Sequence, residues 1–324
     1  MSELDRIDRL AEALEGVLAA PDAASADAGP PADPELAEML RIAQELCDLP
    51  RPAFKAGLAA DLERRAAMAT TTSAPSHEDV QSLSVYLAVR PAVGLIDFVK
   101  RAFGAQELLR TTGTGGGLHA EVRIGDTKVM IGGGEAWGGT PTPTALHLYV
   151  PDADQVYERA LEAGAVSLYA PVDQPYGDRE ASVRDLAGNN WYIATHLRGG
   201  HVPAGLGTVT PYLHPQGSDR LVDFLRQAFA AEAMQVERAP DETIKHAKMR
   251  VGRSVVEMGE AHGPWQPMPT MFYLYVDDVD TAYRRALAAG AASMEEPAVQ
   301  PYGERRAAVR DAFDNQWYLA SPVR

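Results

Sequence analysis

Cysteine is nearly absent from this sequence, because Cys47 is the only one among 324 residues. A single cysteine excludes an intramolecular disulfide and a cysteine-rich metal site. Long hydrophobic runs are also absent, since none approaches the roughly 18–20 apolar residues that a membrane-spanning helix needs. Residues 1–10 alternate charged and apolar side chains and lack the apolar core of a signal peptide. We therefore expect a cytoplasmic protein that does not enter a membrane.

Basic residues are outnumbered as well, with 30 Lys and Arg against 45 Asp and Glu and a net charge of −15. No basic stripe is present, which argues against nucleic-acid binding through phosphate contacts. The excess of negative charge is concentrated in residues 1–82, which hold 16 Asp and Glu against 7 Lys and Arg. This acidic region either meets a basic protein partner or presents solvated helix faces.

Residues 1–78 are predicted to form a helical extension with linkers. Apolar residues recur at helical spacing over residues 4–18 and 36–46, and an Ala/Asp/Pro-rich stretch separates them. Helices this short cannot bury a core of their own. We expect them to dock either on the rest of the chain or on another molecule.

The remainder of the chain is an internal repeat. Residues 143–196 match residues 269–322 without a gap, with 29 of 54 positions identical. DFVKRAFGA (97–105) returns as DFLRQAFAA (223–231), and LHAEVRIG (118–125) returns as KHAKMRVG (245–252). Self-similarity at this level predicts a tandem duplication, with one domain at 79–198 and a second at 206–324.

Each copy divides again into two similar halves. In the first copy the pattern predicts a strand at 86–89, a helix at 95–102 ended by Gly104, and strands that include 119–124 and 128–131. A strand at 146–150, a helix at 153–163 ended by Gly164, and further strands to residue 193 follow. A strand, a helix and three strands, twice per copy, indicate an α+β fold.

Several motifs occur in the same order in both copies. These are VYLAV (85–89) and PYLHP (211–215), the D-F-x-x-x-A-F helices, the HAE and HAK strands, and the ending R-D-x-x-x-N-x-W-Y-x-A. With them, residues 83–322 resemble the vicinal oxygen chelate (VOC) superfamily, which is glyoxalase/bleomycin-resistance/dioxygenase-like, and its PhnB-like branch in particular. The resemblance implies two tandem VOC domains. Each would consist of two βαβββ modules that form a curved mixed sheet around a cleft.

The resemblance also indicates where a metal would bind, since metal-dependent members hold a divalent ion with four side chains on the inner strands. These positions fall on Ser84, Met130, Ala145 and Tyr192 in the first copy, and on Thr210, Glu257, Met271 and Tyr318 in the second. Only Glu257 has a side chain suited to such a site. We therefore expect the usual metal quartet to be absent and no cofactor to be bound.

Aromatic side chains are expected to line the clefts instead. Period-two alternation places six tyrosines on the inner strand faces, and we predict that they bind the ligand: Tyr86, Tyr149, Tyr192, Tyr212, Tyr273 and Tyr318. Trp137 and Trp265 are predicted to cover the clefts, whereas Trp191 and Trp317 should point into the core. Such clefts suit a flat or apolar organic molecule.

The pairing of the modules decides whether a displaced metal site is formed. If modules of different copies pair, His147 shares a cleft with His214 and Glu257, and a two-His, one-carboxylate set could bind a metal. If modules pair within each copy, that set does not exist.

His119 and His246 are candidate acid/base residues or structural strand histidines. Arg179 with Asp185, and Arg305 with Asp311, are predicted to be buried pairs that brace a loop.

Three functions are consistent with these residues. The leading one is a small-molecule-binding VOC protein that holds an aromatic or amphipathic metabolite or drug without the usual metal. The alternative is a VOC-type lyase, isomerase or dioxygenase-like enzyme, which uses the displaced metal site or metal-free His/Tyr acid-base chemistry. A third is a regulatory module in which the N-terminal helices bind a protein.

Overall fold

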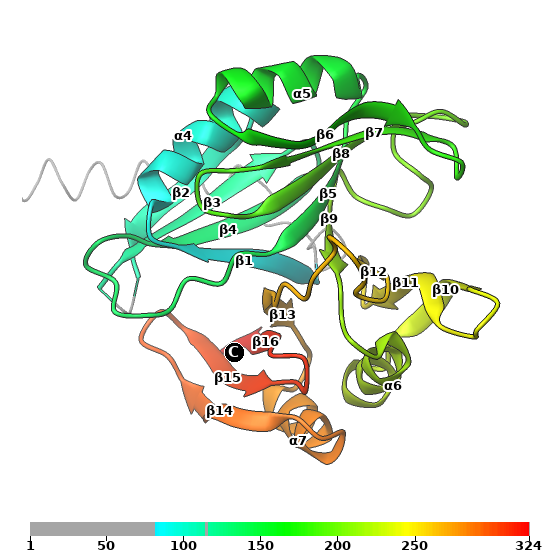
Figure 1. Cartoon of the computed structure of the whole chain (residues 1–324). Coiled ribbons are helices and arrows are strands. Elements are labelled where there is room, and N and C mark those ends of the chain that lie inside the picture. Colours follow the sequence, from blue (N-terminus) through cyan, green and yellow to red (C-terminus); the bar gives the residue numbers. More distant parts are fainter. Residues whose placement is uncertain (1–81, 114–115, 324) are drawn as a thin grey trace, which may run out of the picture. The chain divides into compact units, whose positions relative to one another are not determined.

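The computed structural model describes residues 82–113 and 116–323. The predicted helical extension at residues 1–78 lies outside this part of the chain. Within the described residues, no helix is both long and apolar enough to cross a membrane. The described part contains four helices and sixteen strands, arranged as four βαβββ modules (Figure 1).

The first repeat holds modules 1 and 2. Module 1 consists of β1 (Leu83–Val89), α4 (Ala92–Phe103), β2 (Gln106–Thr112), β3 (Leu118–Ile124) and β4 (Thr127–Gly133). Module 2 consists of β5 (Ala145–Tyr149), α5 (Ala153–Glu162), β6 (Val166–Asp173), β7 (Asp178–Arg184) and β8 (Asn190–His196).

The second repeat holds modules 3 and 4. Module 3 consists of β9 (Val209–Leu213), α6 (Ser218–Phe229), β10 (Glu232–Arg238), β11 (Ile244–Val251) and β12 (Ser254–Met258). Module 4 consists of β13 (Met271–Tyr275), α7 (Val279–Ala288), β14 (Ala292–Val299), β15 (Glu304–Arg310) and β16 (Gln316–Pro322). The predicted order of elements is therefore confirmed.

The helix boundaries follow from capping residues. Asp152 and Asp278 precede α5 and α7, and the carboxylate of each accepts a hydrogen bond from a backbone N–H of the first turn. Gly104 ends α4 in the left-handed conformation, with φ of 69°. Ala230 occupies the equivalent position after α6 with φ of 53°, although it has a Cβ. The two αL residues thus end matching helices at the same place in the repeat.

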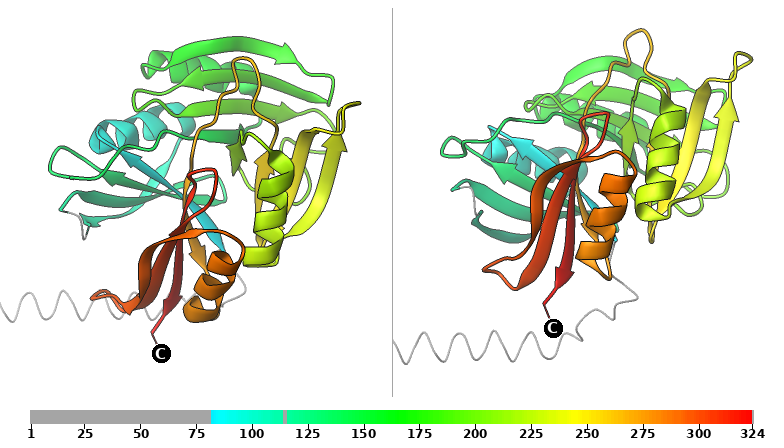
Figure 2. Two further views of the ribbon diagram at one scale, coloured as in Figure 1. Left: turned by 60° about the horizontal axis from the view of Figure 1, so that its bottom comes forward. Right: turned by 90° about the horizontal axis from the view of Figure 1, so that it is seen from below.

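The strands form two eight-stranded sheets, and each sheet combines modules from both repeats (Figure 2). The first sheet joins module 1 to module 4 in the order β14-β15-β16-β13-β1-β4-β3-β2. The second sheet joins module 3 to module 2 in the order β10-β11-β12-β9-β5-β8-β7-β6. The junctions are the antiparallel pairs β1–β13 and β5–β9. Modules of different copies therefore pair, which decides the alternative that the sequence left open.

The helices cover the outer faces of the sheets and pack within each repeat, α4 against α5 and α6 against α7. Trp191 and Trp317 are fully buried in this layer, as predicted. Their rings lie 4.7 Å from those of Phe103 and Phe229, respectively. Helix contacts within a repeat and strand pairing between repeats together tie the two copies into one folded body.

The predicted pairs of buried arginine and aspartate are wrong. Arg179 bonds the carboxylate of Asp154 at the surface instead, and Arg305 does the same with Asp280. A long side chain that starts on a strand end reaches the first turn of the neighbouring helix more easily than the buried turn beyond. Asp185 and Asp311 therefore have partners other than these two arginines.

Asp185 is buried within a turn that joins β7 to β8. Its carboxylate accepts hydrogen bonds from Trp191 Nε1 at 2.9 Å, from Asn189 Nδ2 at 2.9 Å, and from two backbone N–H groups of the turn. Asp311 has the same four partners in the second repeat. The recurring R-D-x-x-x-N-x-W spacing is thus explained as a hydrogen-bonded turn.

Candidate functional site

The inner face of the second sheet, opposite the helices, carries a buried charged group that we call the His147 cluster: His147, Tyr149, Glu180 and Glu257. His147 Nδ1 lies 3.0 Å from Glu257 Oε2, and its Nε2 lies 2.9 Å from Glu180 Oε2. The Tyr149 hydroxyl lies 3.2 Å from the same Nδ1. His147 is 5% exposed and Glu257 is fully buried. Both ring nitrogens of this histidine are therefore engaged by carboxylates.

Three strands of two modules position this cluster. His147 lies on β5 and Glu180 on β7 of module 2, whereas Glu257 comes from β12 of module 3. Sequence reasoning missed Glu180. The signal was present, because Glu180 lies two residues from Ser182 on the same strand face and its counterpart in the other repeat is Arg306. The two copies therefore carry opposite charges at this matched inner position, negative at Glu180 and positive at Arg306.

The cluster is ionised. Burial by itself lowers the pKa of His147, but the neighbouring carboxylates of Glu257 and Glu180 outweigh it and raise that pKa above its ordinary value. Burial opposes the ionisation of Glu257 and Glu180, but the His147 imidazolium holds the pKa of both carboxyls below the usual range. Burial raises the pKa of the Tyr149 hydroxyl, so it remains protonated. An imidazolium thus lies between two carboxylates.

This arrangement predicts how stability depends on pH. A pKa that folding raises contributes stability that is complete below the ordinary histidine value near 6.5 and is lost as the pH rises through the raised value. The lowered carboxyl pKa values contribute above about 4.5 and are lost in acid. Above pH 6.5 the unfolding free energy of the wild type should therefore fall more steeply than that of a triple variant (His147→Gln, Glu180→Gln and Glu257→Gln), in which none of these groups titrates, by about 1.4 kcal/mol per pH unit. Urea titrations across this range test it, and parallel profiles would contradict it.

Aromatic rings pack beside the His147 cluster on the same sheet face. Tyr212 is at their centre, with ring centroids 5.9 Å from His147, 5.5 Å from Tyr192 and 4.8 Å from His214. The Tyr192 hydroxyl lies 2.9 Å from His214 Nε2, and the Tyr212 hydroxyl lies 3.3 Å from His246 Nδ1. Burial lowers the pKa of His214 to about 4, so this ring is neutral. The inner face of the second sheet is thus filled largely by its own side chains.

The displaced metal set predicted from His147, His214 and Glu257 is brought to one sheet but does not converge. His147 bonds the two carboxylates through both nitrogens, and His214 bonds Tyr192. Across residues 82–113 and 116–323, no group of three or more His, Cys, Asp or Glu side chains is arranged to hold a metal ion.

The residues at the family's four metal positions do not fit a divalent ion either. With the observed pairing of modules, the second sheet presents Thr210, Glu257, Ala145 and Tyr192 at these positions, and Glu257 is already paired with His147. The first sheet presents Ser84, Met130, Met271 and Tyr318 there. A thioether, an alcohol and a phenol are poor ligands for a hard divalent ion.

The inner face of the first sheet carries a second aromatic group, which we call the tyrosine face: Tyr86, Tyr273, Tyr275 and Tyr318. Its rings pack with Met130 into a small apolar cluster separate from the main core. Tyr273 and Tyr318 are neighbours on parallel strands, with centroids 6.5 Å apart and ring planes within 6°. Tyr273 is 9% exposed, and the other three tyrosines are half-buried. This face is therefore more accessible than that of the second sheet.

Polar groups surround the tyrosine face. The hydroxyls of Tyr273 and Tyr275 donate to the carboxylate of Glu304, the second at 3.3 Å. The Arg306 guanidinium lies over the Tyr318 ring, 5.2 Å from its centroid, and its buried Nε has no partner within the described residues. The Tyr86 hydroxyl lies 3.1 Å from His119 Nδ1, and burial lowers the pKa of that histidine. The matched histidines His119 and His246 thus occupy equivalent places beside a tyrosine.

The two predicted tryptophan lids lie in the loops that join the modules. Trp265 is 37% exposed, and its ring packs on His262 at 5.0 Å between centroids. Trp137 packs over Gly139, where an added Cβ would collide with the indole ring. Arg90 donates to the Trp137 carbonyl oxygen at 2.9 Å. Both side chains are thus held by neighbours in or near their own loops.

Comparison with known proteins identifies relatives of this arrangement. The family model for the Glyoxalase/Bleomycin resistance protein/Dioxygenase superfamily matches residues 85–193 and 216–319. An uncharacterized protein of Mycobacterium bovis is 39% identical over 128 residues, which cover 36% of this chain and 84% of that protein. An uncharacterized protein of Mycobacterium tuberculosis shows the same identity, with 75% of its length covered.

Solved structures show the same fold at low sequence identity. Glyoxalase I from Zea mays superposes with a TM-score of 0.56 and 14% identity, covering 74% of this chain and 92% of that one. A putative dioxygenase from Bacillus subtilis gives a TM-score of 0.50 and 13% identity, covering 74% and 84%. At such identity the similarity establishes the fold and does not extend to the chemistry.

Proposed function

The chain belongs to the Glyoxalase/Bleomycin resistance protein/Dioxygenase superfamily, and we propose that it binds an aromatic or amphipathic small molecule at the tyrosine face without the family's metal quartet. The observation that carries this proposal is the replacement of the metal positions of the first sheet by Ser84, Met130, Met271 and Tyr318 beside half-buried tyrosine rings.

The chemistry of the tyrosine face supports a flat, partly polar ligand. Aromatic rings offer large apolar contacts at a small cost in conformational entropy, and their hydroxyls give orientation. The Arg306 guanidinium provides a positive charge, and the carboxylate of Glu304 provides an acceptor beside the same rings. The His147 cluster has a different role in this proposal, because its charges are buried and paired with one another.

The proposal is tested with 1-anilinonaphthalene-8-sulfonate, a fluorescent aromatic anion. Tyr318→Ala and Tyr273→Ala should each weaken its binding about 10-fold, which corresponds to about 1.4 kcal/mol of lost ring contact. The control is Tyr176→Ala, which removes an exposed tyrosine near the second sheet. Equal affinity in all four proteins would refute a site at the tyrosine face.

The same dye tests whether ligand binding is independent of a metal ion. After treatment with a chelator the affinity for the dye should be unchanged, and added Zn²⁺ should bind neither sheet stoichiometrically. Saturable zinc binding that His147→Gln abolishes would instead support the displaced metal site.

A second candidate function is metal-free acid-base chemistry at the His147 cluster. A histidine between two carboxylates, with a tyrosine hydroxyl at hydrogen-bonding distance, is a perturbed group of the kind found at functional sites. This candidate requires a carboxylate of the cluster to accept a proton from a bound carbonyl compound, because the His147 imidazolium has no lone pair that could accept it. Exchange of the α-protons of hydroxyacetone in D₂O, followed by NMR, should then depend on His147, and no acceleration over buffer would refute it.

A further inference from the structure

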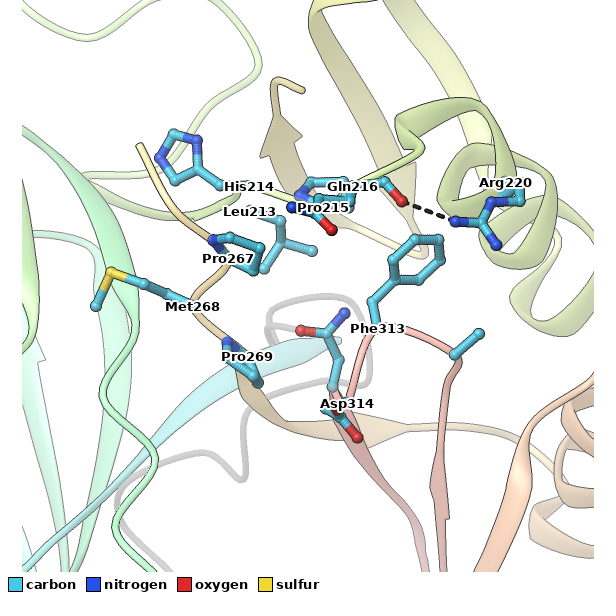
Figure 3. Close-up of a pocket in the computed structure, with 12 residues that line it drawn as sticks. Leu213, His214, Pro215, Gln216, Arg220, Pro267, Met268, Pro269, Phe313 and Asp314 are labelled. Carbon is cyan, nitrogen blue, oxygen red and sulfur yellow. Dashed lines mark hydrogen bonds between the residues drawn. The ribbon is translucent and has the colours of Figure 1, made fainter. Parts of the chain in front are cut away.

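A pocket of about 230 Å³ lies where β9 ends and α6 begins, away from the tyrosine face (Figure 3). The linker that precedes β13 and the turn between β15 and β16 form its other walls. Leu213, Pro215, Pro267, Pro269 and Phe313 contribute an apolar part to a wall that is polar over the larger share of its area. A cavity of about 150 Å³ admits benzene, so this pocket has room for a substituted single ring.

Arg220 supplies a positive charge to this pocket. Its Nη2 donates to the Gln216 carbonyl oxygen at 2.8 Å, and its guanidinium lies over the Phe313 ring at 5.4 Å. Among the described residues it forms no ion pair. Figure 3 shows the guanidinium and the phenyl ring on the same side of the pocket. A cation held in place by a backbone carbonyl and an aromatic ring, without an acidic partner, is a ready partner for a carboxylate.

Three of the residues that border this pocket differ in type from their counterparts in the first repeat. Gly94 stands at the position of Arg220, Leu186 at that of Ala312 and Ala187 at that of Phe313. The Leu186 side chain packs onto Gly94, where an added Cβ would lie 3.3 Å from Leu186 Cδ1. In the second repeat the small Ala312 leaves this space open, and a cation and an aromatic ring border it. Of the two matched sets of residues, only that of the second repeat combines a cation with an aromatic ring.

We infer that this pocket is a second binding site, specific for a small aromatic monocarboxylate. The ring would lie against Phe313 and the prolines, and the carboxylate would accept hydrogen bonds from Arg220. The Asp314 carboxylate in the adjoining turn disfavours a ligand with a second negative charge. This site is independent of the proposed function at the tyrosine face.

The test compares benzoate with benzyl alcohol, which has a similar ring and no charge, on the full chain by NMR titration. Benzoate should bind with a dissociation constant near or below about 1 mM. Arg220→Gln should weaken benzoate about 10-fold and leave benzyl alcohol unchanged. Ala312→Leu, which restores the residue of the first repeat, should weaken both compounds.

A control variant separates this site from a general effect of charge. Arg226→Gln removes an exposed arginine of the same helix and should leave benzoate binding unchanged. Benzoate binding that survives Ala312→Leu, or that Arg220→Gln leaves intact, would overturn the inference. So would the absence of benzoate binding to the wild type.

Discussion

Replacing His147 by alanine should lower the free energy of unfolding by about 3–5 kcal/mol at neutral pH. The substitution leaves the carboxylates of Glu180 and Glu257 buried near one another without the imidazolium that lies between them. Removing one partner of a buried ion pair is costly because the remaining charge loses its compensation and cannot regain water. Thermal unfolding followed by circular dichroism provides the measurement.

Two further variants establish that the loss comes from uncompensated charge. His119→Ala removes a half-buried histidine of the first sheet, whose ring bonds a tyrosine hydroxyl, and should cost only about 1 kcal/mol. In the His147→Ala background, Glu257→Gln should restore part of the lost stability because it removes one of the two stranded charges. A His147→Ala protein as stable as the wild type would show that the cluster is not ionised.

Asp185→Ala should destabilise the first repeat by about 3 kcal/mol or more. The carboxylate accepts four hydrogen bonds, and its loss leaves the buried Trp191 Nε1 and Asn189 Nδ2 without an acceptor. Hydrogen bonds to a charged acceptor contribute about 1.5–3 kcal/mol each, although such contributions are not additive. For a chain of this size the melting temperature should fall by at least about 6 °C.

The second repeat supplies a replicate of this variant, and an exposed ion pair of the first repeat supplies a control. Asp311→Ala removes the same four hydrogen bonds in the second repeat and should have a similar effect. Asp154→Ala breaks the exposed ion pair with Arg179 and should cost less than about 1 kcal/mol. If Asp154→Ala were the more damaging variant, the larger stabilising contribution assigned to the Asp185 turn would be wrong.

The two sheets have the same architecture and different inner faces. His147 corresponds to Tyr273 in the other repeat, Glu257 to Met130, and Glu180 to Arg306. The second sheet therefore buries paired charges, whereas the first presents half-buried rings beside a guanidinium. Because strands of both repeats meet in each sheet, a substitution in one repeat changes a face that the other repeat helps to form.

Local patterns were sufficient to predict most of the fold. The spacing of apolar residues, the helix-ending glycines Gly104 and Gly164, and the repeated motifs predicted the modules in their observed order. Alternation along the strands also predicted which tyrosines share a face with His147 and which tryptophans enter the core. The Asp185 turn was mispredicted, because a motif shows that residues recur together without showing which atoms bond.

By itself, the sequence determined that four βαβββ modules exist, because they follow from residue types that recur at fixed spacings along each repeat. Only the tertiary structure decided that module 1 pairs with module 4 and module 2 with module 3. That choice depends on strand pairs between residues 61–65 positions apart at β5–β9 and 187–191 positions apart at β1–β13, which no local periodicity records. The same long-range pairing brings Glu257 to His147 Nδ1, whereas Glu180 of His147's own module lies at Nε2.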